Sequence, residues 1–483
     1  MCWKAAKALA RAHDDAGARE SEGGTRRTKR RRRGSYGAPA CLAVALLACP
    51  PLLSTLSGQA IAPGEVLTLS HAVETALKTQ PSVMAGAYMV KVNEARIGEA
   101  RSAYYPQANA SMVYTRVSAP SSAALAAIAA AAPGTNPLPL SGGAASGIPG
   151  VYDLYTPSVS FSQMIYDFGR TSGQVKINSL TAQSSRDDLA TTQNTVAFNV
   201  KQAYYNALQA ERDLDTAKQA VEQLQEHLDQ ARSFLEIGTK TKFDVTQAEV
   251  NLSNARLTLI QAENQVSLTR LSLSSAMGIA ETPSFRLEDS LAYAKFNLSL
   301  EEALSTAYER RPDLQSLIKK REAANQSVAL ARAGYLPQLN ANANYYYTGA
   351  DFPLQSGWSA GLTLSVPIFN GFLTRRRLQE AEGAYGAADA NERTARLNIF
   401  TQVRQDYLAL RAAEESIAAS AVAVRQANEN VELASGRYRE GVGIALDVID
   451  AVAARGNAEF AYTRALVNCK NVQAAIQNDI GLR

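Results

Sequence analysis

The sequence predicts an α+β membrane protein in which a tandem-duplicated unit combines long coiled-coil helices with two β-hairpins. The prediction rests on an internal duplication, on long helical apolar patterns, and on four segments of about ten residues in which polar and apolar residues alternate. The chain of 483 residues is 46% hydrophobic but only 7% aromatic. Such a composition suits Ala-rich helices better than a compact core filled by large rings.

Residues 1–60 are expected to form a secretory leader. They hold 11 Lys and Arg against 4 Asp and Glu, whereas the rest of the chain holds 38 against 41. The basic run at 26–33 directly precedes an apolar stretch at 38–56, which is typical of a signal peptide, and cleavage is expected after Ala60. Because the excess positive charge belongs to the leader, it gives no argument for a nucleic-acid partner.

Cys49 offers an alternative processing site within this leader. The sequence Leu46-Leu-Ala-Cys49 resembles a lipobox, in which the cysteine is lipidated and becomes the first residue. Two prolines follow Cys49 at once, and a second apolar stretch lies beyond them, so lipidation and cleavage near Ala60 both stay open. After the leader there is no run of about 18 apolar residues. The chain is therefore expected to be exported and then to be either soluble or a barrel.

Two copies of one unit make up the body of the chain. Leu67 to Pro81 matches Leu298 to Pro312, and the same spacing pairs 104–107 with 335–338. After a longer insertion in the first copy, a second constant spacing pairs Tyr204 with Tyr407, Gly238 with Gly441, Asp244 with Asp447 and Gly278 with Gly481. The predicted organisation is a leader at 1–60, a first repeat at 61–297 and a second repeat at 298–483.

Long segments of each copy have apolar residues in alternating steps of three and four, which predicts helices packed as antiparallel coiled coils. No proline occurs between Gly169 and Glu236, so one helix there would be roughly 100 Å long at about 1.5 Å per residue. The predicted helices span about 70–103, 169–236 and 242–277 in the first repeat, and about 300–334, 372–440 and 444–480 in the second.

Four strands are predicted at about 104–117, 155–167, 335–348 and 358–369. In the third, for example, Gln338, Asn340, Asn342 and Asn344 alternate with Leu339, Ala341, Ala343 and Tyr345. A soluble sandwich would show the same pattern, but helices too long for a compact domain favour membrane barrel strands. Four strands cannot close a barrel, and lipid does not tolerate an open edge. A homotrimer is therefore expected, with the loop at 118–153 facing the exterior.

Glycines and carboxylates mark the points where the long helices reverse. Gly238, Gly441 and Gly443 lie at the predicted turns, where positive φ and little bulk are needed. Asp244 and Asp447 open the returning helices, and a carboxylate near a helix N-terminus contributes about 0.3 to 1 kcal/mol without any further role. Asp450 lies three residues beyond Asp447 on the same face, where capping explains it poorly. In a trimer the two positions would place six carboxylates around one axis, which would attract cations.

Catalytic constellations are not found in the sequence. After the leader the only histidines are His71 and His227, and neither has a cysteine or an acidic pair at metal-ligand spacing. Both are expected to be ordinary surface or interface residues. Walker-type and dinucleotide-binding glycine motifs are missing as well. The protein is therefore expected not to be an enzyme and to need neither a cofactor nor a metal.

The two copies, each with a hairpin between long helices, resemble the outer membrane efflux protein family over Leu67 to Leu482. The most specific stretch is Tyr438-Arg-Glu-Gly-Val-Gly-Ile-Ala-Leu-Asp447-Val-Ile-Asp450, and its counterpart in the first copy runs from 236 to 245. The resemblance implies a trimer with a 12-stranded barrel in the outer membrane and a 12-helix tunnel in the periplasm. It further implies an exit duct for efflux or type I secretion, docked to a periplasmic adaptor and an inner-membrane RND or ABC transporter.

The same resemblance assigns roles at the turns. It implies that Asp447 and Asp450 narrow the periplasmic entrance and that Tyr438 and Asp244 help to latch it. The sequence departs from the family pattern at Gly443, where the family's latch has an arginine, and Lys240 is a nearby cation that could replace it. Adaptor contact is expected near the turn glycines Gly238, Gly441 and Gly443.

The main alternative from another class is a trimeric surface fibre or adhesin, whose chains also pool four strands into one barrel. In such proteins the four strands lie together at the C-terminus, whereas here they are split into two hairpins and the chain ends in a predicted helix. A soluble periplasmic coiled-coil adaptor is a second alternative, but it would have no use for four lipid-compatible strands. The cargo is not predicted by the sequence.

Overall fold

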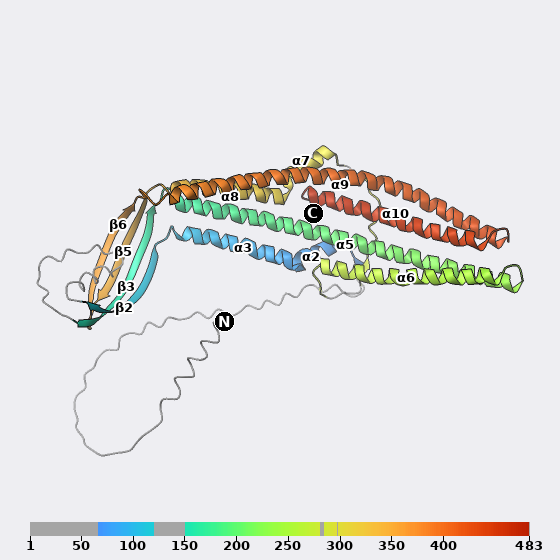
Figure 1. Cartoon of the computed structure of the whole chain (residues 1–483), viewed down its shortest axis with the longest axis horizontal. Helices are drawn as coiled ribbons and strands as arrows, with labels where there is room; N and C mark the ends of the chain where they lie inside the picture. The colour runs from blue at the N-terminus through green and yellow to red at the C-terminus, as the bar shows by residue number, and fades with distance from the viewer. Residues whose placement is uncertain (1–65, 120–149, 281–284, 297, 483) are drawn as a thin grey trace, which may run out of the picture. The chain divides into compact units, whose positions relative to one another are not determined.

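The computed structural model of the chain describes residues 66–119, 150–280, 285–296 and 298–482. The predicted leader, with Cys49 and the expected cleavage site after Ala60, lies outside the described residues, as does most of the loop predicted at 118–153. All described elements belong to one compact unit, Ser57–Arg483. They are mostly helical with one larger sheet, as predicted (Figure 1).

The elements follow the order of two repeats. The first contains β1 (Val66–Leu67), α2 (Leu69–Thr79), α3 (Pro81–Ser102), β2 (Gln107–Ala119), β3 (Gly150–Tyr166), α5 (Arg170–Glu236) and α6 (Lys242–Ala276). The second contains β4 (Arg286–Leu287), α7 (Leu300–Arg310), α8 (Pro312–Ala333), β5 (Gln338–Thr348), β6 (Gln355–Ser365), α9 (Leu373–Arg439) and α10 (Ala445–Asp479). In both repeats, a hairpin of strands is therefore flanked by helices.

Each repeat begins with two helices where the sequence analysis expected one, over about 70–103 and about 300–334. The first helix ends before Pro81 or Pro312, and the residue before each proline is extended: Gln80 has φ −68° and ψ 120°, and Arg311 has φ −64° and ψ 115°. Proline excludes helical geometry from the residue before it and lacks the amide hydrogen that a continuous helix would need. It then begins the next helix, where its fixed φ is favourable. The prediction of single helices was wrong for this reason.

Glycines at the ends of α6 and α10 pack against these two breaks. Gly278 has φ +73° and Gly481 has φ +75°, which favours glycine at a helix C-terminus. A Cβ atom at Gly278 would lie 3.0 Å from Cα of Gln80, and one at Gly481 would lie 2.8 Å from the carbonyl oxygen of Arg310. In both repeats, the backbone of the glycine therefore packs directly against the backbone at the proline break.

The two longest helices, α5 and α9, have 67 residues each, and their partners α6 and α10 have 35. Each pair forms an antiparallel hairpin, and α10 also packs against α5 (Figure 1). One core cluster near the turns combines residues of all four helices: Leu224, Leu228, Ala231, Val245, Ala248, Leu252, Ala434, Tyr438, Ala445, Val448, Ile449, Ala451 and Val452. Within the described residues, no helix has an apolar stretch long enough to span a membrane.

The larger sheet has the strand order β2-β3-β5-β6, and all neighbours are antiparallel. One row across it contains Asn109, Ser160, Asn344 and Ser359, and the adjacent row contains Ala110, Val159, Tyr345 and Trp358. Since successive side chains point to opposite faces, the sheet has a small-polar face and an apolar face. Among the described residues, β2 and β6 each have one edge without a partner strand.

A buried tyrosine of α5 holds the starts of both repeats together. The hydroxyl of Tyr204 lies 2.9 Å from the carbonyl oxygen of Leu67 and 2.8 Å from that of Glu288. Leu67 belongs to β1, which pairs in parallel with β4. The segments that precede α2 and α7 are therefore both fastened to the same point of the long helix.

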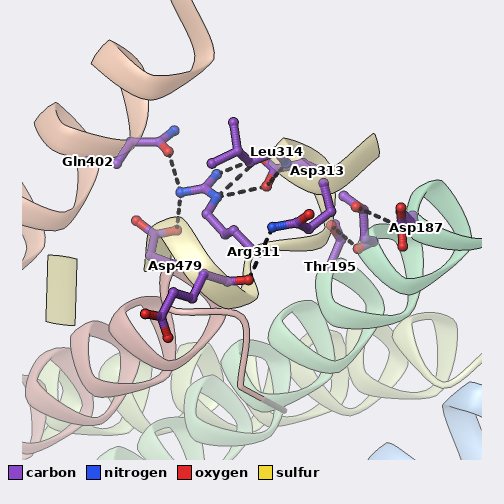
Figure 2. A network of polar contacts seen from close by, with 10 residues as sticks. Asp187, Thr195, Arg311, Asp313, Leu314, Gln402 and Asp479 are labelled. Carbon is purple, nitrogen blue, oxygen red and sulfur yellow. Dashed lines mark hydrogen bonds and ion pairs between the residues drawn. The ribbon is translucent and has the colours of Figure 1, made fainter. Parts of the chain in front are cut away.

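A polar network joins the start of α8 to α9 and α10 (Figure 2). The guanidinium of Arg311 donates to Asp313 at 3.0 Å and to Gln402 at 3.0 Å, and it lies 3.7 Å from a carboxylate oxygen of Asp479. Burial, together with the negative charge of Asp479, raises the pKa of the neighbouring Asp406 to about 6, while Arg311 opposes the rise. This network fixes the end of α10 beside the proline break.

Candidate functional site

The candidate site lies at the two turns that join α5 to α6 and α9 to α10. Gly238 has φ +80° and Gly441 has φ +76°. The amides that follow them fold back onto the ends of the helices: Thr239 donates to the carbonyl of Phe234 at 2.9 Å, and Val442 donates to that of Arg437 at 3.0 Å. Both predicted turn glycines therefore occupy left-handed positions that side chains disfavour.

Gly443 is required for a different reason. A Cβ atom at this position would lie 3.0 Å from the backbone nitrogen of Tyr438 and 3.1 Å from the carbonyl carbon of Arg437. Its amide donates to the carbonyl of Arg437 at 2.9 Å. The glycine thus lets the second turn fold tightly against the end of α9, and it leaves the Gly443 carbonyl free to accept a hydrogen bond from the first turn.

Asp244 serves the N-terminus of α6. Its carboxylate accepts hydrogen bonds from the amide of Thr241 at 2.9 Å and from the Thr241 hydroxyl at 2.8 Å, while the Thr241 hydroxyl accepts from the Asp244 amide. This reciprocal arrangement is a capping box. The hydrogen bonds from Thr241 lower the pKa of Asp244. The predicted latch role of Asp244 stays a prediction, since within the described residues its side chain accepts hydrogen bonds from Thr241 of its own turn.

The second turn has no such box. Ile444 stands where the first turn has Thr241, and it has no hydroxyl to cap α10. Asp447 and Asp450 are exposed one turn apart, whereas Val448 and Ile449 between them are buried in the core. Residues three apart lie on the same helix face, so the two carboxylates point together away from the packed side of the hairpin.

Lys240 and Tyr438 link the two turns. The Tyr438 side chain is fully buried at the end of α9. The ammonium of Lys240, from the first turn, lies 5.1 Å from the centroid of the Tyr438 ring and donates to the carbonyl of Gly443 at 3.2 Å. A cation over an aromatic face is attracted by the negative potential of the ring. The structure therefore brings Lys240, Tyr438 and Gly443 together, with the cation of one turn bound to the backbone of the other.

His227 belongs to this contact and was not predicted as part of it. Its side chain is 3% exposed, and its ring centroid lies 4.8 Å from that of Tyr438. Within the part of the chain that the structure describes, neither ring nitrogen has a hydrogen-bond partner, and the same holds for the Tyr438 hydroxyl. Burial lowers the pKa of His227, and the charge of Asp244 opposes this shift. The expectation of a surface position was wrong for His227, because the ring lies inside the contact between the two hairpins. The available signal of its burial was its helical spacing from the core residues Leu224 and Ala231.

Comparison with known proteins decides the family. The outer membrane efflux protein family matches residues 72–279 and 303–481, which is well over half of the chain. The chain belongs to this family. Protein CyaE of Bordetella pertussis is 27% identical over 406 residues, which cover 82% of this chain and 78% of CyaE. Outer membrane protein TolC of Vibrio cholerae is 23% identical over 314 residues, covering 62% of this chain and 70% of that protein.

Solved structures show the same fold. The CmeC outer membrane channel of Campylobacter jejuni is similar with a TM-score of 0.73 and 18% sequence identity, covering 86% of this chain and 85% of CmeC. A membrane protein from Pseudomonas aeruginosa is similar with a TM-score of 0.74 and 20% identity, covering 85% of this chain and 92% of that one. The mixture of long helices and a small sheet is therefore the fold of outer membrane channels.

Family membership gives the general function that the sequence predicted. The protein is an outer-membrane exit duct of a Gram-negative bacterium and not an enzyme. The alternative of a surface fibre or adhesin is not supported, because the matches extend over both repeats and belong to efflux proteins and channels.

Proposed function

We propose that the protein acts as a homotrimer, in which three copies close one barrel from their sheets and one tunnel from their long helices. The observation that carries this proposal is the four-stranded sheet with an apolar face and an unpaired edge at both β2 and β6 in the described chain. An open edge is not tolerated in lipid, where backbone groups find no water. Pairing β6 of one copy with β2 of the next would remove every edge.

The helices support the same assembly. Large apolar side chains are exposed along α6 and α9 in the described part of the chain: Leu257, Ile260 and Leu271 on α6, and Leu397, Phe400 and Leu408 on α9. Leu257 and Ile260, and likewise Leu397 and Phe400, are three residues apart and so neighbours on one helix face, and exposed apolar patches are typical of a protein interface. In the proposed trimer these stripes pack against the helices of the adjacent copies and complete the wall of the periplasmic tunnel.

The turns form the entrance of this tunnel. Three copies would place the exposed Asp447 and Asp450 as six carboxylates around one axis, where they attract cations and narrow the passage. Lys240 and Tyr438 act as the latch, because they join the first turn to the backbone of Gly443 in the second. The lysine thereby supplies the cation that the family pattern has as an arginine at position 443.

The surface around Gly238 and Gly441 is proposed to dock a periplasmic adaptor, and an inner-membrane RND or ABC transporter is proposed to drive transport. Relatives carry names such as efflux pump outer membrane protein TtgC of Pseudomonas putida, which is 25% identical over 317 residues. The passive duct leaves the choice of cargo, whether drug, metal ion or polypeptide, to the transporter with which it assembles.

Single-channel conductance in planar bilayers tests the entrance. The wild type is expected to give small, discrete, cation-selective steps, and the Asp447→Ala, Asp450→Ala double variant larger and less selective ones. A matched control replaces two exposed carboxylates of α7, Glu301 and Glu309, by alanine and should keep the selectivity of the wild type. Unchanged selectivity in the aspartate variant would overturn the assignment of the entrance. A monomeric mass of the detergent-extracted protein would overturn the trimer.

A further inference from the structure

His227 is an unusual residue to find inside a coiled coil. It lies in the apolar cluster beside the turns, between helices that contribute leucine, valine and alanine. A buried polar group without a hydrogen-bond partner destabilises a structure, and native proteins retain few of them. Among the described residues, three such atoms, both imidazole nitrogens and the Tyr438 hydroxyl, belong to two rings in contact, at the point where the first hairpin meets the second.

We propose that His227 is a positioning residue of the latch: its neutral ring holds the two turns together, and its protonation in acid releases them. The inference rests on the proposed function of Lys240 and Tyr438 as a latch, and it adds a proton as the signal that opens it. The ring acts through Tyr438, because it packs directly against the side chain on which Lys240 also rests.

The charges around His227 determine the direction of the effect. From α9 it faces Tyr438, and from the first turn the ammonium of Lys240 approaches the same tyrosine ring. From α6 the charge of Asp244 acts on the ring, and one oxygen of that carboxylate already accepts both hydrogen bonds from Thr241. The imidazolium would thus enter an apolar cluster near a second cation, and within the described residues no hydrogen bond joins the ring to a carboxylate.

The remaining neighbours do not compensate this charge. On α5 itself, Asp229 lies 3.9 Å from Arg232 as an exposed ion pair. The residues of α10 in the same cluster are apolar, among them Ala445 and Val448. A Phe234 ring, whose centroid lies 5.6 Å from that of Tyr438, covers the contact from the end of α5. Within the described residues, protonation of His227 therefore adds an unpaired charge to the joined turns.

The pH range follows from ordinary imidazole chemistry. A histidine exposed to water titrates near pH 6.5, and burial lowers the pKa of His227 in the joined state. The joined state is then favoured above that ordinary pKa and weakens as the pH falls below it. A difference of one pKa unit between joined and separated turns changes their ratio by up to about tenfold.

Few other groups can account for a pH response at the turns. The sequence has three histidines, of which His13 lies in the predicted leader and His71 lies on α2. Asp406 also titrates near pH 6, but it lies in the network with Asp479 at the far end of α10. That end is about 35 residues from the turn, which is roughly 50 Å at about 1.5 Å per residue. His71→Gln is therefore the matched control, and measurements confined to the turns separate His227 from Asp406.

The test compares the wild type, His227→Gln, His227→Leu and His71→Gln at pH 7.5 and pH 5.5. The glutamine keeps a polar side chain, the leucine fills the apolar cluster, and neither can take up a proton. In planar bilayers the wild type and His71→Gln are expected to show a conductance or open probability several-fold higher at pH 5.5, up to about tenfold. Both His227 variants should give the same value at the two pH values and retain cation selectivity.

Hydrogen exchange of peptides covering 223–244 and 434–450, corrected for intrinsic pH dependence, provides a readout that does not require a channel. The wild type should exchange faster at these peptides in acid, and the His227 variants should not. A pH response that persists in both His227 variants would overturn the inference. If no copy conducts, yet exchange at the turns depends on pH only when His227 is present, the proposed entrance function fails while the proton-sensitive contact stands.

Discussion

Replacing Tyr204 by phenylalanine tests how the starts of the two repeats are fastened to α5. The ring is fully buried and would remain, so packing is preserved and only the hydroxyl is lost. The carbonyl of Leu67 still accepts from the amide of Glu288 at 3.2 Å, but the carbonyl of Glu288 loses the hydroxyl as its donor. Losing one partly buried hydrogen bond lowers stability by about 1 kcal/mol. Burial raises the pKa of Tyr204 to about 12, so the hydroxyl is protonated throughout the usual pH range.

The measurement is hydrogen exchange of the segments around β1 and β4, because local opening reports the lost bond directly and does not require reversible unfolding of the whole protein. A loss of 1 kcal/mol corresponds to exchange that is about fivefold faster. Tyr205→Phe is the matched control, since Tyr205 is also buried but its hydroxyl makes no hydrogen bond within the described part of the chain. Equal exchange in the two variants would refute the reasoning that the Tyr204 hydroxyl fastens these strands.

Two further substitutions probe charge. Because the pKa of Asp406 is raised to about 6, the folded protein binds this proton more tightly than the unfolded chain, and stability should fall as the pH rises from about 4 to 6. Asp406→Asn should remove most of that fall, on the order of 1 kcal/mol because the group is partly exposed, as measured at pH 4 and pH 6 by hydrogen exchange of peptides around Asp406 and the end of α10, corrected for intrinsic pH dependence. Ile444→Thr should let Asp447 form a capping box, which would stabilise α10 by about 1 kcal/mol and reduce cation selectivity in bilayers.

The long helices and the turns were predictable from local sequence. Sixty-seven residues with a helical apolar period and no proline leave few alternatives to a long helix, and a glycine where the period stops marks the reversal. The strands were predictable for the same reason, since alternation of small polar and apolar residues is also a local signal. The breaks at Pro81 and Pro312 had an equally local cause, the geometry before proline, which the expectation of continuous helices overlooked.

The internal duplication did not predict which of two equivalent residues is buried. Tyr204 and Tyr407 are equivalent in the duplication, yet Tyr204 is fully buried against two carbonyls, whereas Tyr407 is partly exposed with the guanidinium of Arg411 5.2 Å from its ring centroid. The difference comes from β1 and β4, which pair across more than two hundred residues and cover only the first tyrosine. The burial of His227 had a local signal in its helical spacing, but its contact with Tyr438 did not, because Tyr438 belongs to the other repeat.

Because of the duplication, both turns have a glycine at the reversal and an aspartate at the start of the returning helix. Whether that aspartate takes part in a helix cap depends on the residue three positions before it. Thr241 engages the carboxylate of Asp244 in a cap, whereas Ile444 leaves that of Asp447 exposed beside Asp450. A good cap stabilises a helix by about 1 kcal/mol, and α10 lacks this contribution. Proteins tolerate such local losses chiefly where a group serves function. One turn has thus become a structural element that carries the lysine proposed as part of the latch, and the other presents the charges proposed to line the entrance.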